Sequence, residues 1–181
     1  MLTAAPFAGL EVRRAGDGSA VLAGSFAYGQ ETELAPGRRE VFAPGALHWR
    51  DEVHLLSQHE FSRPLAGTRA GTLTIQNTDE ALTFEARLSA RVLATQAARD
   101  ALALVEEGLA AGVSPGFTVA PDGVEVRKAG DGLLRTIRKA ELVELSIVTR
   151  PAYPGASVSA RSWEIVTAPR HDHGARFRWR A

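Results

Sequence analysis

The chain contains no cysteine among its 181 residues. This absence excludes a disulfide framework, thiolate metal sites and a cysteine nucleophile, so any covalent catalysis would fall to serine, threonine or a carboxylate. Long hydrophobic runs are also missing, since no stretch approaches the roughly 20 apolar residues that cross a bilayer. The first seven residues lack the basic and hydrophobic regions of a signal peptide. We therefore expect a cytoplasmic protein that does not insert into a membrane.

The chain also lacks a net charge, because 21 Lys and Arg residues balance 21 Asp and Glu residues. No overall electrostatic field would hold such a molecule on nucleic acid or on an anionic membrane, which argues against nucleic acid as a partner. The composition, 45% hydrophobic and 23% charged, is that of an ordinary globular protein. The length suits one domain with a hydrophobic core.

Alternating apolar residues predict a β-rich chain with one clear helix. The expected strands cover residues 9–14, 20–28, 53–59, 72–75, 81–88, 117–119, 124–128, 133–139 and 141–149. Residues 29–39 and 64–71 are expected to form loops, and the turn at Pro44 and Gly45 is expected to lead into a short helix through Trp49. The helix, residues 95–111, begins at the N-cap candidate Thr95 and ends at Gly112. Its expected buried stripe is Ala98, Leu102, Val105 and Leu109.

Three residues carry the candidate chemistry. Ser114 lies between Gly112 and Gly116, which remove side-chain bulk near its hydroxyl, although such glycines more often mark a plain turn after a helix. His59 ends an expected strand, and Glu144 belongs to a strand with strict alternation. Taken singly, each is more often structural than catalytic.

The order of four segments carries a resemblance. Phe42–Leu47, Leu55–Glu60, Gly112–Phe117 and Glu144–Ala152 follow one another as Phe-Ala-Pro-Gly-Ala-Leu, Leu-Leu-Ser-Gln-His-Glu, Gly-Val-Ser-Pro-Gly-Phe and Glu-Leu-Ser-Ile-Val-Thr-Arg-Pro-Ala. In this order they resemble the prohead maturation proteases of tailed bacteriophages, distant relatives of the herpesvirus capsid protease, assemblin. The resemblance covers about residues 20–160, most of the chain.

The resemblance implies an α+β, β-rich fold with an antiparallel β-barrel-like core flanked by helices. It implies a serine endopeptidase that processes the scaffold and the major capsid protein inside the assembling procapsid of a phage, prophage or gene transfer agent. Ser114 matches the nucleophile, His59 the general base and Glu144 the acidic third member. An imidazole is well suited to take a serine proton at neutral pH, and a carboxylate on its far nitrogen would fix its tautomer. No cofactor is expected.

We divide the chain into a protease domain, residues 1–160, and a basic C-terminal tail, residues 161–181. His171 and His173 in the tail lack a third ligand, so we expect a solvated tail without a metal. Removal of the tail by self-processing and a homo-oligomeric state are left open.

Two departures from the family pattern qualify the roles. Pro115 follows the serine, where the family usually has an ordinary apolar residue, and it has no backbone N–H. The oxyanion donors must therefore come from elsewhere, and the candidates are Gly116, another loop amide, or a guanidinium such as Arg135 or Arg138. The second departure is Gln58-His59-Glu60, where the family commonly shows Asn-His-Asp. Glu60 is therefore an alternative orienting acid to Glu144, although neighbouring strand residues point to opposite faces. Two rival functions remain: a catalytically inactive assembly scaffold of the same fold, and a ligand-binding β-barrel with Ser114 at its mouth.

Overall fold

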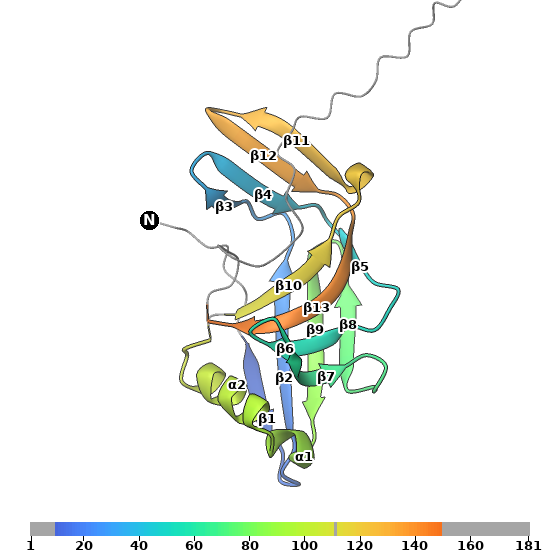
Figure 1. Cartoon of the computed structure of the whole chain (residues 1–181), viewed down its shortest axis with the longest axis vertical. Coiled ribbons are helices and arrows are strands. Elements are labelled where there is room, and N and C mark those ends of the chain that lie inside the picture. Colours follow the sequence, from blue (N-terminus) through green and yellow to red (C-terminus); the bar gives the residue numbers. More distant parts are fainter. Residues whose placement is uncertain (1–9, 111, 150–181) are drawn as a thin grey trace, which may run out of the picture.

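The computed structural model describes residues 10–110 and 112–149, which form three β-sheets and two short helices (Figure 1). The β9 sheet, with strand order β1-β2-β9-β8, contains β1 (Glu11–Arg14), β2 (Ala20–Ala27), β8 (Leu73–Asn77) and β9 (Ala81–Leu88). The β13 sheet, with strand order β10-β13-β6-β7, contains β6 (His54–Ser57), β7 (Glu60–Gly67), β10 (Gly112–Thr118) and β13 (Ala140–Val148), and β5 (Leu47–His48) also pairs with β13. The β12 sheet, with strand order β11-β12-β4-β3, contains β3 (Thr32–Ala35), β4 (Arg38–Phe42), β11 (Val124–Ala129) and β12 (Gly132–Ile137).

The expected β-rich α+β class is confirmed, but the barrel is not. Among the described residues the sheets are open, and β13 runs parallel to both β5 and β6 while β12 runs parallel to β4. Parallel neighbours need long crossover connections, which an antiparallel meander would lack. The described part of the chain therefore has no barrel mouth for the ligand-binding alternative.

The sheets meet at a cluster of phenylalanines. Phe42 of the β12 sheet lies 5.0 Å, centroid to centroid, from both Phe26 of the β9 sheet and Phe117 of the β13 sheet. Both contacts are edge-to-face, the arrangement that the ring quadrupole favours. Phe117 belongs to the same strand as Ser114, so this cluster also fixes the strand that carries the candidate nucleophile.

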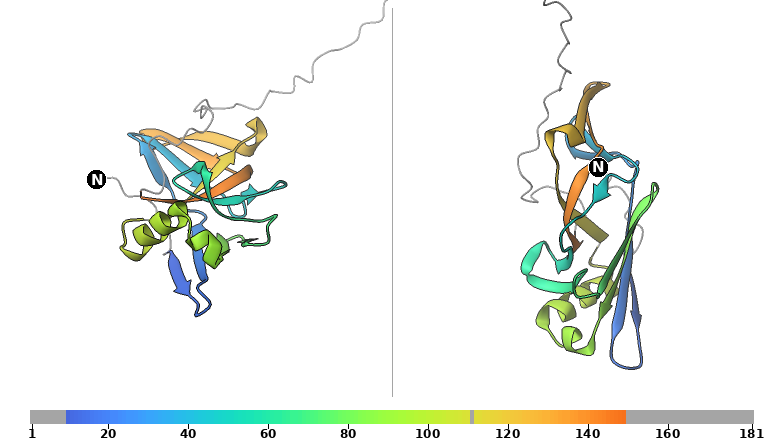
Figure 2. Two further views of the ribbon diagram at one scale, coloured as in Figure 1. Left: turned by 60° about the horizontal axis from the view of Figure 1, so that its bottom comes forward. Right: turned by 90° about the vertical axis from the view of Figure 1, so that its right-hand side faces the viewer.

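The alternation predicted in β9 is confirmed, because its core-facing side chains are buried and the others are not. Leu82, Phe84, Ala86 and Leu88 are each at most 4% exposed. Burial of one large apolar side chain contributes about 1.5–3 kcal/mol. In Figure 2 the β9 sheet forms one layer, with the helices and the β6–β7 hairpin on one side of it.

The predicted helix is present as α2 (Gln96–Glu106). A shorter helix that the sequence did not predict, α1 (Ala90–Leu93), precedes it. The N-cap prediction is confirmed, since the Thr95 side chain accepts a hydrogen bond from the Ala98 amide. The predicted end is wrong: the helix stops before Gly108, which adopts φ +68° as a left-handed C-terminal glycine does. The buried face therefore ends early, and Leu109 is 61% exposed.

Other local predictions fail where tertiary pairing decides the structure. The expected loop over residues 29–39 contains β3 and the start of β4, whose ladder is completed by β12. The expected helix after Gly45 is replaced by β5, which pairs with β13. The expected loop at residues 64–71 begins as β7, an edge strand that tolerates Pro64. The domain boundary at residue 160, the tail, His171 and His173 lie outside the described residues.

Candidate active site

His59 lies in a two-residue turn and not at a strand end as expected. Ser57 pairs with Glu60, and between them Gln58 and His59 adopt φ values of 56° and 61°. Positive φ at both central positions is the pattern of a type I′ hairpin turn, which usually uses Asn and Gly. Such conformations cost on the order of 1–3 kcal/mol for each residue without a special preference, and they cluster at functional sites.

Glu144, on the neighbouring strand β13, contacts the His59 ring. Its side chain is buried at 5% exposure, and Oε1 lies 2.7 Å from His59 Nδ1. Its other oxygen, Oε2, accepts a hydrogen bond of 2.5 Å from the Ser146 hydroxyl. An ionised carboxylate only accepts hydrogen bonds, so Nδ1 carries the proton in this contact and Nε2 is left as an acceptor.

Gly116 provides the space that Glu144 occupies. The two residues are paired across β10 and β13. A Cβ atom at position 116 would lie 2.2 Å from Glu144 Oε1 and 2.8 Å from Cδ. The sequence suggested that this glycine clears space around the serine; in the structure the free space above it holds the acid.

Ser114 lies on the same face of the β13 sheet as Glu144. It is paired directly with Ser146, and residues 114 and 116 share one face of β10, as residues 144 and 146 share one face of β13. Directly opposed residues have Cβ atoms about 4.5–5.5 Å apart. Ser114 is 2% exposed, and among the described residues no hydrogen bond joins it to His59.

Among the described residues, Glu60, the alternative acid, forms its ion pair with Arg63, whereas the His59 ring contacts Glu144. The carboxylate of Glu60 lies 3.8 Å from the Arg63 guanidinium, and the Glu60 side chain is 52% exposed. Glu60 begins β7, after the turn has reversed the chain. The structure thus brings Glu144 to His59 and leaves Glu60 at the surface.

Pro115 is accommodated because β10 is the edge strand of its sheet. The Ile147 carbonyl accepts a hydrogen bond from the Gln58 amide, so the backbone of Ile147 faces β6. By alternation, Ser146 and Glu144 face β10, and the opposed Ser114 and Gly116 direct their amides toward β13. The nitrogen of Pro115 then points away from the ladder, where its missing hydrogen breaks no pairing.

The same register bears on the oxyanion donors suggested by the sequence. The Gly116 amide is directed into the sheet, and the two guanidinium groups are paired with carboxylates in the β12 sheet. Arg135 is buried against Glu40, and Arg138 contacts Glu125. Of the four suggested donors, a loop amide alone stays open.

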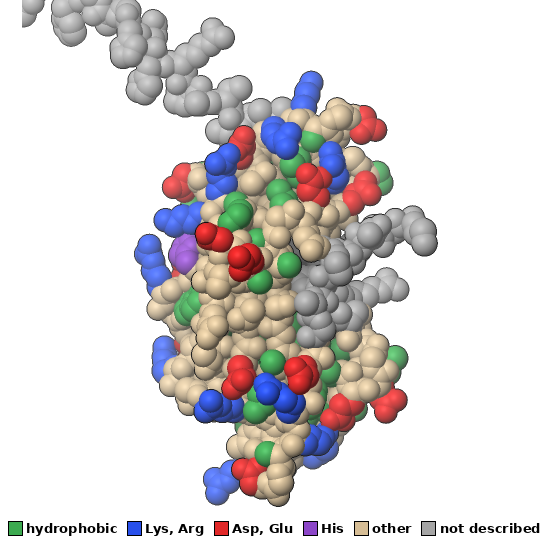
Figure 3. Space-filling model, turned by 180° about the vertical axis from the view of Figure 1, so that it is seen from behind, with side chains coloured by type: hydrophobic (Ala, Val, Ile, Leu, Met, Phe, Trp, Pro, Cys, Tyr) green, Lys and Arg blue, Asp and Glu red, His purple; other side chains and the backbone are tan. Residues whose placement is uncertain are grey.

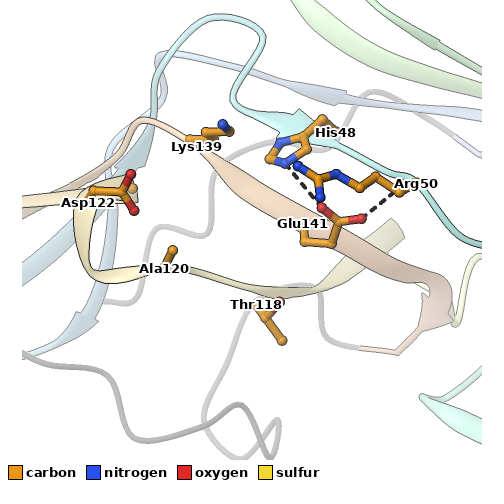
Figure 4. Close-up of a pocket in the computed structure, with 8 residues that line it drawn as sticks. His48, Arg50, Thr118, Ala120, Asp122, Lys139 and Glu141 are labelled. Carbon is orange, nitrogen blue, oxygen red and sulfur yellow. Dashed lines mark hydrogen bonds and ion pairs between the residues drawn. The ribbon is translucent and has the colours of Figure 1, made fainter.

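A second histidine–glutamate pair lies on β5 and β13, and the sequence did not predict it. His48 Nε2 is 3.1 Å from Glu141 Oε2, and Glu141 Oε1 accepts from the Arg50 amide (Figure 4). Thr118 is paired with Glu141 across β10 and β13. These side chains line a cavity of about 290 Å³ together with Ala120, Asp122, Gly123 and Lys139. No sequence motif marks this pair, because only the strand register brings it together.

The surface carries charges of both signs, as the balanced composition implies. On the face shown in Figure 3, Lys and Arg side chains are interspersed with Asp and Glu side chains. Within residues 10–110 and 112–149, no cluster of three or more His, Asp or Glu side chains is arranged to hold a metal ion. In the same part of the chain, no helix has the length and apolar character needed to cross a membrane.

The site thus holds a histidine against a buried carboxylate, with a serine on the same sheet face as the carboxylate, and these are the three residue types of a serine peptidase triad. Comparison with protein families agrees: the model of the Caudovirus prohead serine protease family matches residues 9–169. The chain therefore belongs to the Caudovirus prohead serine protease family, and the family is one of serine peptidases. Neither a curated protein nor a solved structure matched the chain.

Proposed function

We propose that Ser114 is the nucleophile, His59 the general base and Glu144 the orienting acid of this peptidase. The observation that carries the proposal is the 2.7 Å contact between His59 Nδ1 and Glu144 Oε1. This contact fixes the tautomer in which Nε2 can accept the serine proton. Catalytic hydrogen bonds are often long in free enzymes and shorten when substrate binds, so the missing bond between Ser114 and His59 does not oppose the assignment.

The reaction follows the usual course for acyl transfer. The Ser114 oxygen attacks the carbonyl carbon of the scissile peptide bond while His59 Nε2 removes the hydroxyl proton. His59 then gives that proton to the leaving amine, and water hydrolyses the acyl-enzyme by the same route. Glu144, on the other ring nitrogen, stabilises the imidazolium that forms in each step.

The proposed substrates are the scaffold segment and the major capsid protein of an assembling procapsid, in a tailed phage, a prophage or a gene transfer agent. Membership of the prohead protease family supports this choice, because a prohead is the capsid before maturation. The proposed place of action is the interior of the procapsid within the host cell.

Co-expression with a capsid-protein precursor that carries its scaffold segment tests both proposals. Ser114→Ala and His59→Ala should fold and leave the precursor intact, whereas Glu144→Gln should cleave it slowly. Thr118→Ala is the matched control, since it removes a hydroxyl from the same face of β10 beside the other histidine–glutamate pair. It should cleave like the wild type.

Full processing by Ser114→Ala would overturn the assignment of the nucleophile. A wild-type protein that leaves the precursor whole and reacts with no serine-directed phosphonate would instead favour the inactive assembly scaffold.

A further inference from the structure

The Ser146 side chain forms hydrogen bonds to both Glu144 and His59, the proposed acid and base that activate Ser114. Its hydroxyl donates to Glu144 Oε2 at 2.5 Å and accepts from the backbone N–H of His59 at 3.0 Å. The residue has no solvent exposure, so water does not compete for either bond. One buried hydroxyl thus contacts both the acid and the turn that carries the base.

The polarity of these two bonds leaves the hydroxyl a single orientation. A serine hydroxyl has one proton to donate, and the His59 amide can only donate, so the proton must point to Glu144. Hydrogen bonds in such a chain strengthen one another in a region without water. Ser146 therefore holds Oε2 in place while Oε1 remains directed at the imidazole.

The bond to the His59 amide matters because the turn is locally unfavourable. His59 and Gln58 both have positive φ, and β-hairpin turns of this type normally use Asn and Gly. The His59 amide lies in the turn and bonds to a side chain of the next strand. That bond fixes where the imidazole stands relative to Glu144.

We propose that Ser146 is a positioning residue of this peptidase, acting on catalysis through Glu144 and His59 without touching the substrate. The inference rests on the proposed roles of Ser114, His59 and Glu144. It predicts that loss of the hydroxyl slows the chemical step and leaves binding of a small probe unchanged.

The test measures the rate at which a fluorophosphonate probe inactivates the full-length protein, as a function of probe concentration. Ser146→Ala should lower the maximal inactivation rate by about 10- to 100-fold, the range for small displacements of catalytic groups. The probe concentration at half-maximal rate should not change. Ser57→Ala is the matched control, because Ser57 is also buried in the same sheet and makes no hydrogen bond to Glu144; it should react like the wild type.

A double-mutant cycle separates positioning from a general effect on the fold. In a Glu144→Ala background, Ser146→Ala should cause a much smaller further loss than in the wild type, because one of the two residues through which it acts is already gone and only the bond to the His59 amide remains to be lost. Losses that multiply in the double variant would overturn the proposal, as would a Ser146→Ala variant with the wild-type rate. If Ser146→Ala does not fold, Ser146→Cys supplies a near-isosteric weak donor and should show the same loss of rate.

The outcome is distinguishable from failure of the proposed function. If the wild-type protein is not labelled at Ser114, the catalytic assignment itself fails. If the wild type is labelled and Ser146→Ala is labelled equally fast, the role of Ser146 alone is rejected.

Discussion

Replacing Gly116 with alanine would displace the Glu144 side chain from its contact with His59. The added Cβ would lie 2.2 Å from Glu144 Oε1, 2.8 Å from Cδ and 2.9 Å from Cγ, and ordinary contact begins at 3.4 Å. The carboxylate must therefore withdraw by roughly 1 Å. Its 2.7 Å contact with His59 Nδ1 would then exceed the length of a strong hydrogen bond, about 3.2 Å at most.

The magnitude follows from that displacement. A misplacement of about 1 Å can cost about 100-fold in rate, and overpacking a well-filled site costs about 1–3 kcal/mol of stability. We expect Gly116→Ala to lower the rate of phosphonate inactivation by about 100-fold. We also expect it to lower the free energy of unfolding, measured in denaturant, by about 1–3 kcal/mol. Gly16→Ala is the control, because a Cβ there meets nothing within 4 Å.

A double variant tests whether the clash with Glu144 causes the loss of stability. When Glu144→Ala is also present, the atoms that the new Cβ would strike are gone, so Gly116→Ala should then cost little stability. A single Gly116→Ala variant with the wild-type inactivation rate would show that the position of Glu144 does not limit catalysis.

Three further predictions concern the stability of the fold. Gln58→Asn should raise the free energy of unfolding by about 0.5–1 kcal/mol, since Asn tolerates positive φ, and a decrease would contradict the strained turn. Tyr28 donates to Asn77 Oδ1 at 2.7 Å, and burial raises the pKa of its phenol to about 12. The stabilisation from this raised pKa is complete below the ordinary tyrosine pKa of about 10 and is lost as the pH rises through about 12, so Tyr28→Phe should flatten the dependence of stability on pH in that window. Thr95→Ala should cost about 1 kcal/mol through loss of the α2 N-cap without changing phosphonate reactivity.

Local signals in the sequence predicted what local physics determines. The alternation of β9 and the N-cap at Thr95 follow from side-chain period and from capping chemistry, and both are present. The end of α2 was misplaced because Gly108 and Gly112 are equally good local stops. Packing decides between them, and only Gly108 has the left-handed conformation.

In the candidate site, too, local sequence predicted some features and tertiary pairing determined the others. Residue types and their order predicted Ser114, His59 and Glu144, but the sequence does not contain the strand register that sets His59 beside Glu144. Nor could local patterns show that Gly116 makes room for the acid, because that depends on pairing across β10 and β13. The turn at His59 was missed because Gln-His lacks the usual type I′ residues.

The assignment of Ser114 as the nucleophile is tested most directly by mapping where a fluorophosphonate attaches, with mass spectrometry of the digested protein. We expect one modified residue, Ser114, with labelling lost in Ser114→Ala and His59→Ala and kept in Thr118→Ala. Labelling of Thr118, beside the His48–Glu141 pair, or persistent labelling of Ser114→Ala, would contradict this assignment.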